Sequence, residues 1–315
     1  MSEQMAQLPT GIELCFETFG DQGDAPLLLI MGLGGPMGWW SLDFCHKLVG
    51  RGFFVIRYDN RDVGHSTRVH TDRPVVRRQL VSTYLGKRRH APYSIFDLAS
   101  DAVGLLDHLG VERSHVVGVS MGGMVAQTVA IEHPERVSSL TSIMASTGRR
   151  NVGWAHPRLL PMLFAPVATT KEEYVTRTAM GTAMIGSARY PRDEAVMRAL
   201  AEETWDRGYS PEGALRQLLA VLTQPDRTRA LRGLDVPACV VHGLADRLVH
   251  ASGGRATARA IRGAELVLVP DMAHDLPPQL DDVVADAIQR TAARAGTDQP
   301  AANPATNNPA TIRDF

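Results

Sequence analysis

A serine stands between two glycines in the segment 114–123, SHVVGVSMGG, with the spacing Gly-x-Ser-x-Gly. The β-branched run before this serine is typical of a buried strand, and the apolar segment after it predicts a helix. In such a strand-turn-helix unit the serine lies on a strained turn, and the glycines on either side avoid clashes. The pattern therefore makes Ser120 a candidate nucleophile whose hydroxyl stands at the start of a helix.

A serine hydroxyl needs a base to take its proton, and that base needs a carboxylate to orient it. On a parallel sheet, these groups should follow the serine in loops at the C-terminal ends of later strands. The predicted strand 237–242 runs into GLADRLV, which offers Asp246, and the strand 265–269 runs into PDMAHDLP, which offers His274. Asp235 precedes its strand and would lie at the wrong end of the sheet. We expect Asp246 to orient His274.

Acyl transfer also needs backbone N–H groups that hold a developing oxyanion. Met121 follows the candidate nucleophile directly at the predicted helix start. A glycine-rich loop at 32–36 follows the predicted strand 25–31, and its glycines allow the backbone to approach a substrate closely. We predict that the N–H groups of Leu33 and Met121 form the oxyanion hole, although the loop could also be a simple strand-to-helix turn. This chemistry needs no metal and no organic cofactor.

Buried strands alternate with helices along most of the chain, which predicts right-handed crossovers and a mostly parallel α/β sheet covered on both faces. Strands are expected at 12–20, 25–31, 53–58, 115–117, 137–144, 237–242 and 265–269. The helix after Ser94 carries a capping-box pattern with Asp97 and stops at Gly110. His242 falls inside a predicted strand, so we interpret it as a packed core histidine.

The alternation stops between residues 147 and about 232, where only helical segments are expected, at 157–166, 170–185, 191–207 and 210–222. This block is interpreted as an all-helical insertion over the C-terminal edge of the sheet. Several of its methionines and aromatic residues could line a pocket, although helical spacing of such residues is more typical of internal packing. They are Trp154, Met162, Phe164, Met180, Met184, Met197 and Trp205.

The predicted organisation is a core in two parts, a cap, and a polar tail rich in proline, asparagine and alanine that we expect to be disordered. The core comprises 1–146 and 233–294, the cap 147–232, and the tail 295–315. The basic stretch 66–93 has two interpretations. It is either a solvated loop with a short helix near 75–85, or a rim that attracts acidic substrates.

Composition excludes several classes of function. Of 315 residues, 44% are hydrophobic, which is enough for a sizeable core, and the net charge of −1 argues against a partner that is a nucleic acid or a membrane surface. The three cysteines, Cys15, Cys45 and Cys239, form no CxxC pair and are expected to be free thiols in a reducing compartment. With no visible signal peptide or membrane span, we expect a cytoplasmic protein.

Taken together, the motifs GVSMGG, MGLGG, DNRDVGHS, GLADRLV and MAHDLP resemble the α/β-hydrolase superfamily over residues 10–294. Within it, the chain is similar to the lid-bearing serine esterases. The stretch from LLLIMG to VIRYDNRDVGHST resembles aclacinomycin methylesterases and related bacterial hydrolases. Many relatives carry His-Gly at the oxyanion loop where this chain has Met31-Gly32, as the methylesterases do. The resemblance implies that the turn residues Asp59, Arg61 and Asp62 form a structural hydrogen-bond network.

The resemblance implies hydrolysis of a small-molecule carboxylic ester through an acyl-enzyme, and the apolar insertion indicates a hydrophobic substrate of small to medium size. A serine at position 120 argues against haloalkane dehalogenases and epoxide hydrolases, which use aspartate there. The same triad would also serve a cofactor-free perhydrolase, a carbon–carbon bond hydrolase or a lactonase, and a few members of this fold are non-catalytic ligand receptors. Oligomeric state is not evident from the sequence.

Overall fold

The computed structural model describes residues 2–72, 74–87 and 90–297. Within them, eight strands form one sheet in the order β1-β2-β4-β3-β5-β6-β7-β8. The strands are β1 (Gln4–Gln7), β2 (Glu13–Phe19), β3 (Ala25–Ile30), β4 (Phe53–Tyr58), β5 (Ser114–Val119), β6 (Val137–Ile143), β7 (Ala238–Gly243) and β8 (Glu265–Val269). The pairs β1–β2 and β2–β4 are antiparallel, and every later pair is parallel. Central strands such as β4, β5 and β7 are buried along their whole length, as their β-branched and apolar sequences require.

Helices cover both faces of the sheet, and the sheet separates two hydrophobic clusters. Helices α1 (Leu42–Val49) and α11 (Asp281–Thr297) contribute to one cluster, and α3 (Ile95–His108), α4 (Met121–Glu132) and α10 (Ser252–Ala260) contribute to the other. The predicted α/β fold is confirmed. The parallel strands β3, β5, β7 and β8 bring the loops at their C-terminal ends to one edge of the sheet.

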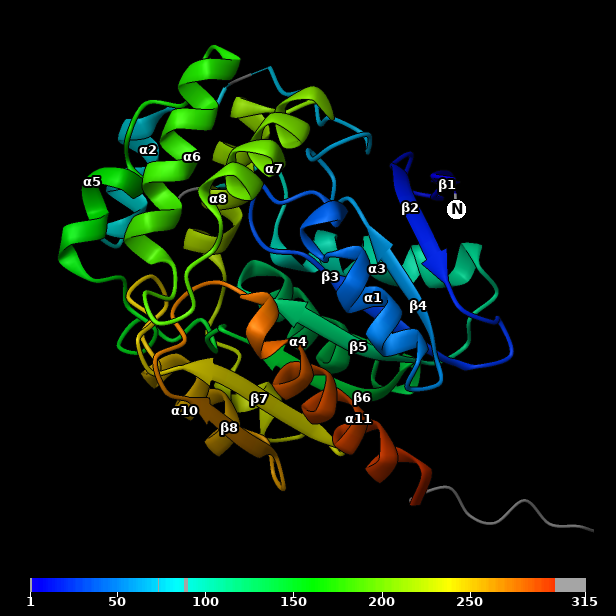
Figure 1. Ribbon diagram of the computed structural model, residues 1–315. Helices are drawn as coiled ribbons and strands as arrows, with labels where there is room; N and C mark the ends of the chain where they lie inside the picture. Colours follow the sequence, from blue (N-terminus) through cyan, green and yellow to red (C-terminus); the bar gives the residue numbers. More distant parts are fainter. Residues whose placement is uncertain (1, 73, 88–89, 298–315) are drawn as a thin grey trace, which may run out of the picture.

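Between β6 and β7 the chain forms helices α5 (Leu160–Leu163), α6 (Lys171–Ile185), α7 (Glu194–Asp206), α8 (Pro211–Thr223) and α9 (Thr228–Leu231). Figure 1 shows α5 to α8 gathered beyond one side of the sheet. We call residues 147–232 the cap. Helix α2 (Arg77–Tyr84), from the basic stretch, packs against α8. Thr170 and Ser210 each accept a hydrogen bond from the first turn of the following helix, as their sequence context predicts.

One strand and two element boundaries deserve correction against the sequence-based prediction. Strand β1 was not predicted, because QMAQ is polar and only Ala6 of the four residues is buried. Helix α7 begins at Glu194, and not near 191, because the Asp193 side chain caps its first turn. Helix α11 continues to Thr297, so the predicted start of the tail at 295 is wrong. The rest of the predicted tail, 298–315, lies outside the described residues.

The sequence also predicted free cysteine thiols and no membrane-spanning segment. Cys15, Cys45 and Cys239 are buried free thiols, as expected from their scattered positions. In the part of the chain that the structure describes, no helix combines the length and the apolar character needed to cross a membrane.

Candidate active site

Ser120 lies on a strained turn between β5 and α4. Its backbone has φ 56° and ψ −117°, a conformation that is costly for a residue with a side chain. A Cβ atom on Gly118 would lie 2.1 Å from the carbonyl oxygen of Gly122, and one on Gly122 would lie 2.1 Å from that of Ile30. The backbone therefore admits only glycine at both positions, and this is the physical basis of the Gly-x-Ser-x-Gly spacing.

The structure brings Ser120, His274 and Asp246 together, although 126 and 28 residues separate them along the chain in the order Ser120, Asp246, His274. The distance from His274 Nε2 to Ser120 Oγ is 2.9 Å, and that from His274 Nδ1 to Asp246 Oδ2 is 2.7 Å. Asp246 follows β7 and His274 follows β8, in the loops where the sequence places them. The imidazole is thus within hydrogen-bond distance of both a hydroxyl and a carboxylate.

Asp246 is buried and held ionised. Its Oδ1 accepts hydrogen bonds from the N–H groups of Leu248 (2.8 Å) and Val249 (2.9 Å). Burial opposes the ionised form, but the charge of His274 and hydrogen bonds from His242 and His274 outweigh it and hold the pKa of Asp246 below its usual range. His242 is fully buried, as expected, and its Nε2 lies 2.7 Å from the Val249 carbonyl oxygen and 3.5 Å from Asp246 Oδ2.

The predicted oxyanion loop lies directly beside the serine. A Cβ atom on Gly32 would be 3.3 Å from the Ser120 Cβ, so the loop backbone passes within contact distance of the hydroxyl-bearing side chain. Among the described residues, the N–H groups of Leu33 and Met121 meet no hydrogen-bond acceptor. The Asn60 side chain donates a hydrogen bond to the Met31 carbonyl oxygen (3.1 Å), which holds the start of the loop.

A cavity of about 2070 Å³ opens beside these residues, and Ser120, Leu33, Met121 and His274 all lie on its wall. Six of the seven methionines and aromatic residues singled out in the cap line it; the exception is Trp205, which packs against Tyr174 and Tyr209. Part of the basic stretch, including Tyr84 and Lys87, also lines the cavity. The short helix expected near 75–85 is present as α2, and the attraction of acidic substrates by this stretch stays a prediction.

A model of the alpha/beta hydrolase fold family matches residues 25–278 of the chain. The chain belongs to the α/β-hydrolase family. It is 29% identical over 298 residues to a rhodomycin D methylesterase of Streptomyces peucetius, covering 88% of this chain and 94% of that protein. A second rhodomycin D methylesterase, from a Streptomyces species, is 30% identical over the same coverage. The resemblance to bacterial methylesterases is therefore confirmed.

Further comparisons agree on the fold. A 3-oxoadipate enol-lactonase of Acinetobacter baylyi is 33% identical over 140 residues, which cover 44% of this chain and 43% of that protein. The crystal structure of an enol-lactonase from Burkholderia xenovorans superimposes with a TM-score of 0.70 at 24% identity, covering 94% of this chain and all of the other. At that identity, the structural match supports the α/β-hydrolase fold alone.

In this α/β hydrolase, the turn after β4 joins the core to the cap through ion pairs. Arg216 of α8 donates to both carboxylate oxygens of Asp62, at 2.7 and 2.8 Å, and Tyr93 donates to the same carboxylate at 2.7 Å. Arg61 binds Asp101 in the same two-pronged way. Arg61 and Asp62 therefore make structural hydrogen bonds, as the resemblance implied, and Asp59 does the same through the Met37 N–H and Arg207.

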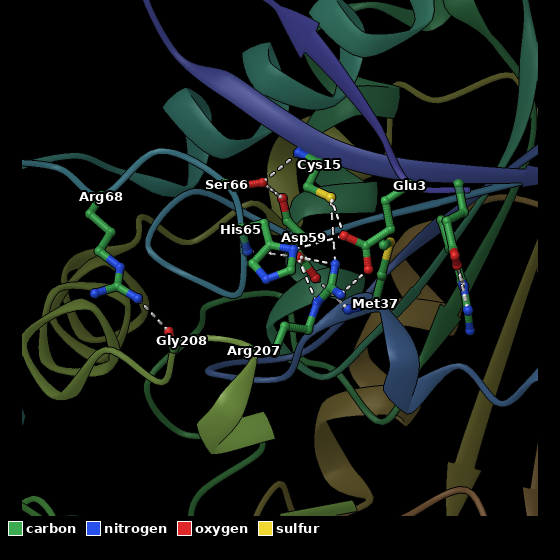
Figure 2. A network of polar contacts seen from close by, with 11 residues as sticks. Glu3, Cys15, Met37, Asp59, His65, Ser66, Arg68, Arg207 and Gly208 are labelled. Carbon is green, nitrogen blue, oxygen red and sulfur yellow. Dashed lines mark hydrogen bonds and ion pairs between the residues drawn. The ribbon is translucent and has the colours of Figure 1, made fainter. Parts of the chain in front are cut away.

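Figure 2 shows a second junction, where Arg207 after α7 contacts Asp59, Glu3 and Cys15. Glu3, Cys15 and His65 each offer one atom that could bind a metal ion, and these three atoms lie within 4.8 Å of one another. The Arg207 guanidinium already supplies the positive charge there, and burial raises the pKa of the Cys15 thiol to about 12, which disfavours the thiolate that metals bind. This cluster is better explained as the anchor of the cap.

Sequence reasoning missed several polar residues of the cap that contact the active-site loops, among them Ser187 and Gln217. Both are buried. Gln217 had a recognisable signal, because the buried positions of α8 include Gly213, Arg216, Gln217 and Ala220, a helical face on which apolar residues are expected. Ser187 follows α6 in an irregular segment and carried no such signal.

Proposed function

We propose that this α/β hydrolase is a serine esterase that cleaves carboxylic esters through an acyl-enzyme. The observation that carries the proposal is the continuous chain of short contacts from Ser120 through His274 to Asp246. Such a chain allows the imidazole to take the hydroxyl proton while the carboxylate stabilises the imidazolium that forms. The methylesterase relatives support an ester as the substrate.

In the first step, Ser120 Oγ attacks the acyl carbon and its proton passes to His274 Nε2. The N–H groups of Leu33 and Met121, which have no internal acceptor among the described residues, hold the resulting oxyanion. The tetrahedral intermediate collapses, the acyl–oxygen bond breaks, and His274 gives its proton to the leaving alcohol. In the second step, His274 activates a water that attacks the acyl-enzyme, and Ser120 leaves with the proton restored.

The cavity sets the expected size of the substrate. At about 2070 Å³ it exceeds the 300–1,000 Å³ that is ordinary for small-molecule sites, so it has room for a larger group than the small to medium one expected from the sequence. Its wall carries methionines that adapt to irregular apolar shapes, such as Met121, Met124, Met162 and Met184. We propose an ester with a bulky apolar acyl or alcohol group. A cytoplasmic location stays a prediction from the sequence.

A lactonase is the second candidate, because an enol-lactonase is 33% identical over 44% of this chain. The two activities share every step up to the acyl-enzyme and differ in whether the leaving alcohol remains tethered to the acyl group. Parallel assays with an open-chain ester and a lactone of matched size distinguish them. A dominant lactone turnover would replace the esterase assignment and leave the catalytic residues unchanged.

The test is a p-nitrophenyl ester series of increasing acyl length, combined with intact-mass analysis after treatment with a fluorophosphonate. Wild type should show burst release and gain one adduct, and the optimum chain length should be long. Ser120→Ala should give neither. Ser100→Ala, an exposed serine on α3, is the matched control and should behave like wild type. An unlabelled wild type that turns over no ester and no lactone contradicts the proposal.

A further inference from the structure

The cap holds the loop that carries His274 through contacts with three consecutive residues, two by their backbone N–H groups and one by its side chain. The Ala273 N–H donates to Ser187 Oγ (2.8 Å), and the His274 N–H donates to the Ile185 carbonyl oxygen (2.9 Å). The Asp275 carboxylate accepts from both the N–H (3.0 Å) and the hydroxyl of Ser187. The short segment 185–187, at the end of α6, therefore fixes the backbone at Ala273 and His274 and the side chain of Asp275.

The cap also holds the predicted oxyanion loop, through a different helix. Gln217 Oε1 of α8 accepts a hydrogen bond from the Gly34 N–H (2.8 Å), and its Nε2 donates to the Arg61 carbonyl oxygen (3.0 Å). The Gln217 side chain is fully buried, and both ends of its amide are used. Because Gly34 follows Leu33 directly, this bond fixes the peptide next to the predicted oxyanion donor.

These contacts differ from the two ion pairs between cap and core, that of Arg207 with Asp59 in Figure 2 and that of Arg216 with Asp62. Arg207 and Arg216 join the cap to the turn after β4, and neither lies on the cavity wall or contacts the loops 32–35 and 273–275. Ser187 and Gln217 make their cap–core bonds to the loops that carry His274 and Leu33. A displacement of about 1 Å in such a group can cost about a hundredfold in rate.

We propose that Ser187 and Gln217 are positioning residues, through which the cap sets the placement of His274 and of the oxyanion loop. The inference rests on the proposed function, since it concerns the same acyl transfer. It assigns the cap a part in building the transition-state site beyond lining the substrate cavity. Neither residue would touch the reacting atoms; each acts through the loop that it binds.

The test compares Ser187→Ala and Gln217→Met with wild type and with the control Arg207→Lys. Methionine keeps the buried volume of Gln217 but provides no comparable hydrogen bonds. Lysine at position 207 keeps the charge and loses the two-pronged contact with Asp59. For each protein, kcat and KM are measured with one p-nitrophenyl ester, together with the dissociation constant of an alkyl boronic acid that forms a tetrahedral adduct with a catalytic serine.

We expect kcat to fall about 10- to 100-fold in Ser187→Ala and Gln217→Met, while KM changes less than about threefold. The reason is that misplacement of His274 or of the oxyanion loop weakens contacts to the transition state more than contacts to the bound substrate. Boronic-acid affinity should fall in parallel with kcat. Ser187→Thr retains the hydroxyl and should recover most of the rate. Arg207→Lys should lower the melting temperature and leave kcat and boronic-acid affinity near the wild-type values.

Two results would overturn the inference. In one, the Ser187 and Gln217 variants melt earlier but keep wild-type kcat at a temperature where circular dichroism shows them folded. In the other, Arg207→Lys reduces kcat by the same factor, which would show that any loosening of the cap lowers kcat. If Gln217→Met does not fold, Gln217→Leu supplies the same comparison. Failure of the proposed function is separate, since wild type itself would then bind no boronic acid and turn over no ester.

Discussion

The loops of the sheet and the segments of the cap approach His274 from different parts of the chain and contribute differently. The sheet loops carry the groups proposed to act on the substrate, Ser120, His274 and the N–H of Leu33, and also Asp246, which is proposed to orient His274. The cap contributes apolar cavity wall and the polar bonds that hold two of those loops in place. Reactive groups and the groups that fix their positions are thus supplied by separate parts of the fold.

This division has a physical consequence. The strained turn at Ser120 is secured inside the core by close packing of Gly118 and Gly122 and by a hydrogen bond from the Ser120 N–H to the Ile143 carbonyl oxygen (2.8 Å). The loops that carry Leu33 and His274 depend in addition on bonds from the cap. Changes in the sheet loops should therefore remove chemistry with little loss of structure, whereas changes at the ion pairs that join the cap to the turn after β4 should mainly alter stability.

The largest effect is expected from Asp246→Asn. The amide no longer stabilises the imidazolium and favours the wrong histidine tautomer, so kcat should fall on the order of 10⁴-fold. The protein should stay folded, because the side-chain oxygen can still accept from Leu248 and Val249. Steady-state kinetics measure the fall in kcat, and circular dichroism shows whether the variant stays folded. A variant that kept a rate near wild type would show that Asp246 is not the orienting carboxylate.

The sequence allowed the sheet-loop residues to be named because their constraints are local. Gly118 is required by a contact within the turn and Gly122 by a contact with the end of β3, but together they leave a short Gly-x-Ser-x-Gly pattern. The positions of Asp246 and His274 follow from the rule that parallel strands end at one edge. Each of these signals occupies a few adjacent residues, so it is visible without knowledge of the fold.

The cap contacts could not be predicted in the same way. Ser187 bonds to residues 86 to 88 positions later, and Gln217 bonds to Gly34, which is 183 positions earlier. Helix positions in the cap were predicted to within a few residues, but the packing of those helices on the core depends on pairings over such distances. The strand β1 was missed for a related reason, because its pairing with β2 depends on main-chain hydrogen bonds that its polar side chains do not reveal.

The second prediction concerns the junction itself. Arg216→Met leaves the fully buried Asp62 carboxylate without its guanidinium partner, which should lower the free energy of unfolding by about 3–5 kcal/mol. Below the melting transition, kcat should stay within about threefold of wild type, the reverse of the pattern for Asp246→Asn. Urea denaturation gives the stability. The double variant Asp62→Leu with Arg216→Met should lose less than the sum of the single losses, and strict additivity would show that the two side chains do not interact.

The smallest effect is a pH dependence that shows Asp246 acting on stability as well as on chemistry. Because its pKa in the folded protein is held below the usual value near 3.9, the ionised carboxylate stabilises the fold above about pH 4, and this contribution is lost as the pH falls through the lower, folded-state pKa. Wild type should therefore exceed Asp246→Asn in unfolding free energy by about 2 kcal/mol at pH 7, and the gap should narrow below pH 4. Asp235→Asn, at an exposed carboxylate, should show no such change. A gap that widened on acidification would mean that Asp246 is protonated more readily in the folded protein than in the unfolded chain. The contacts from Leu248, Val249 and His274 would then not stabilise its charge.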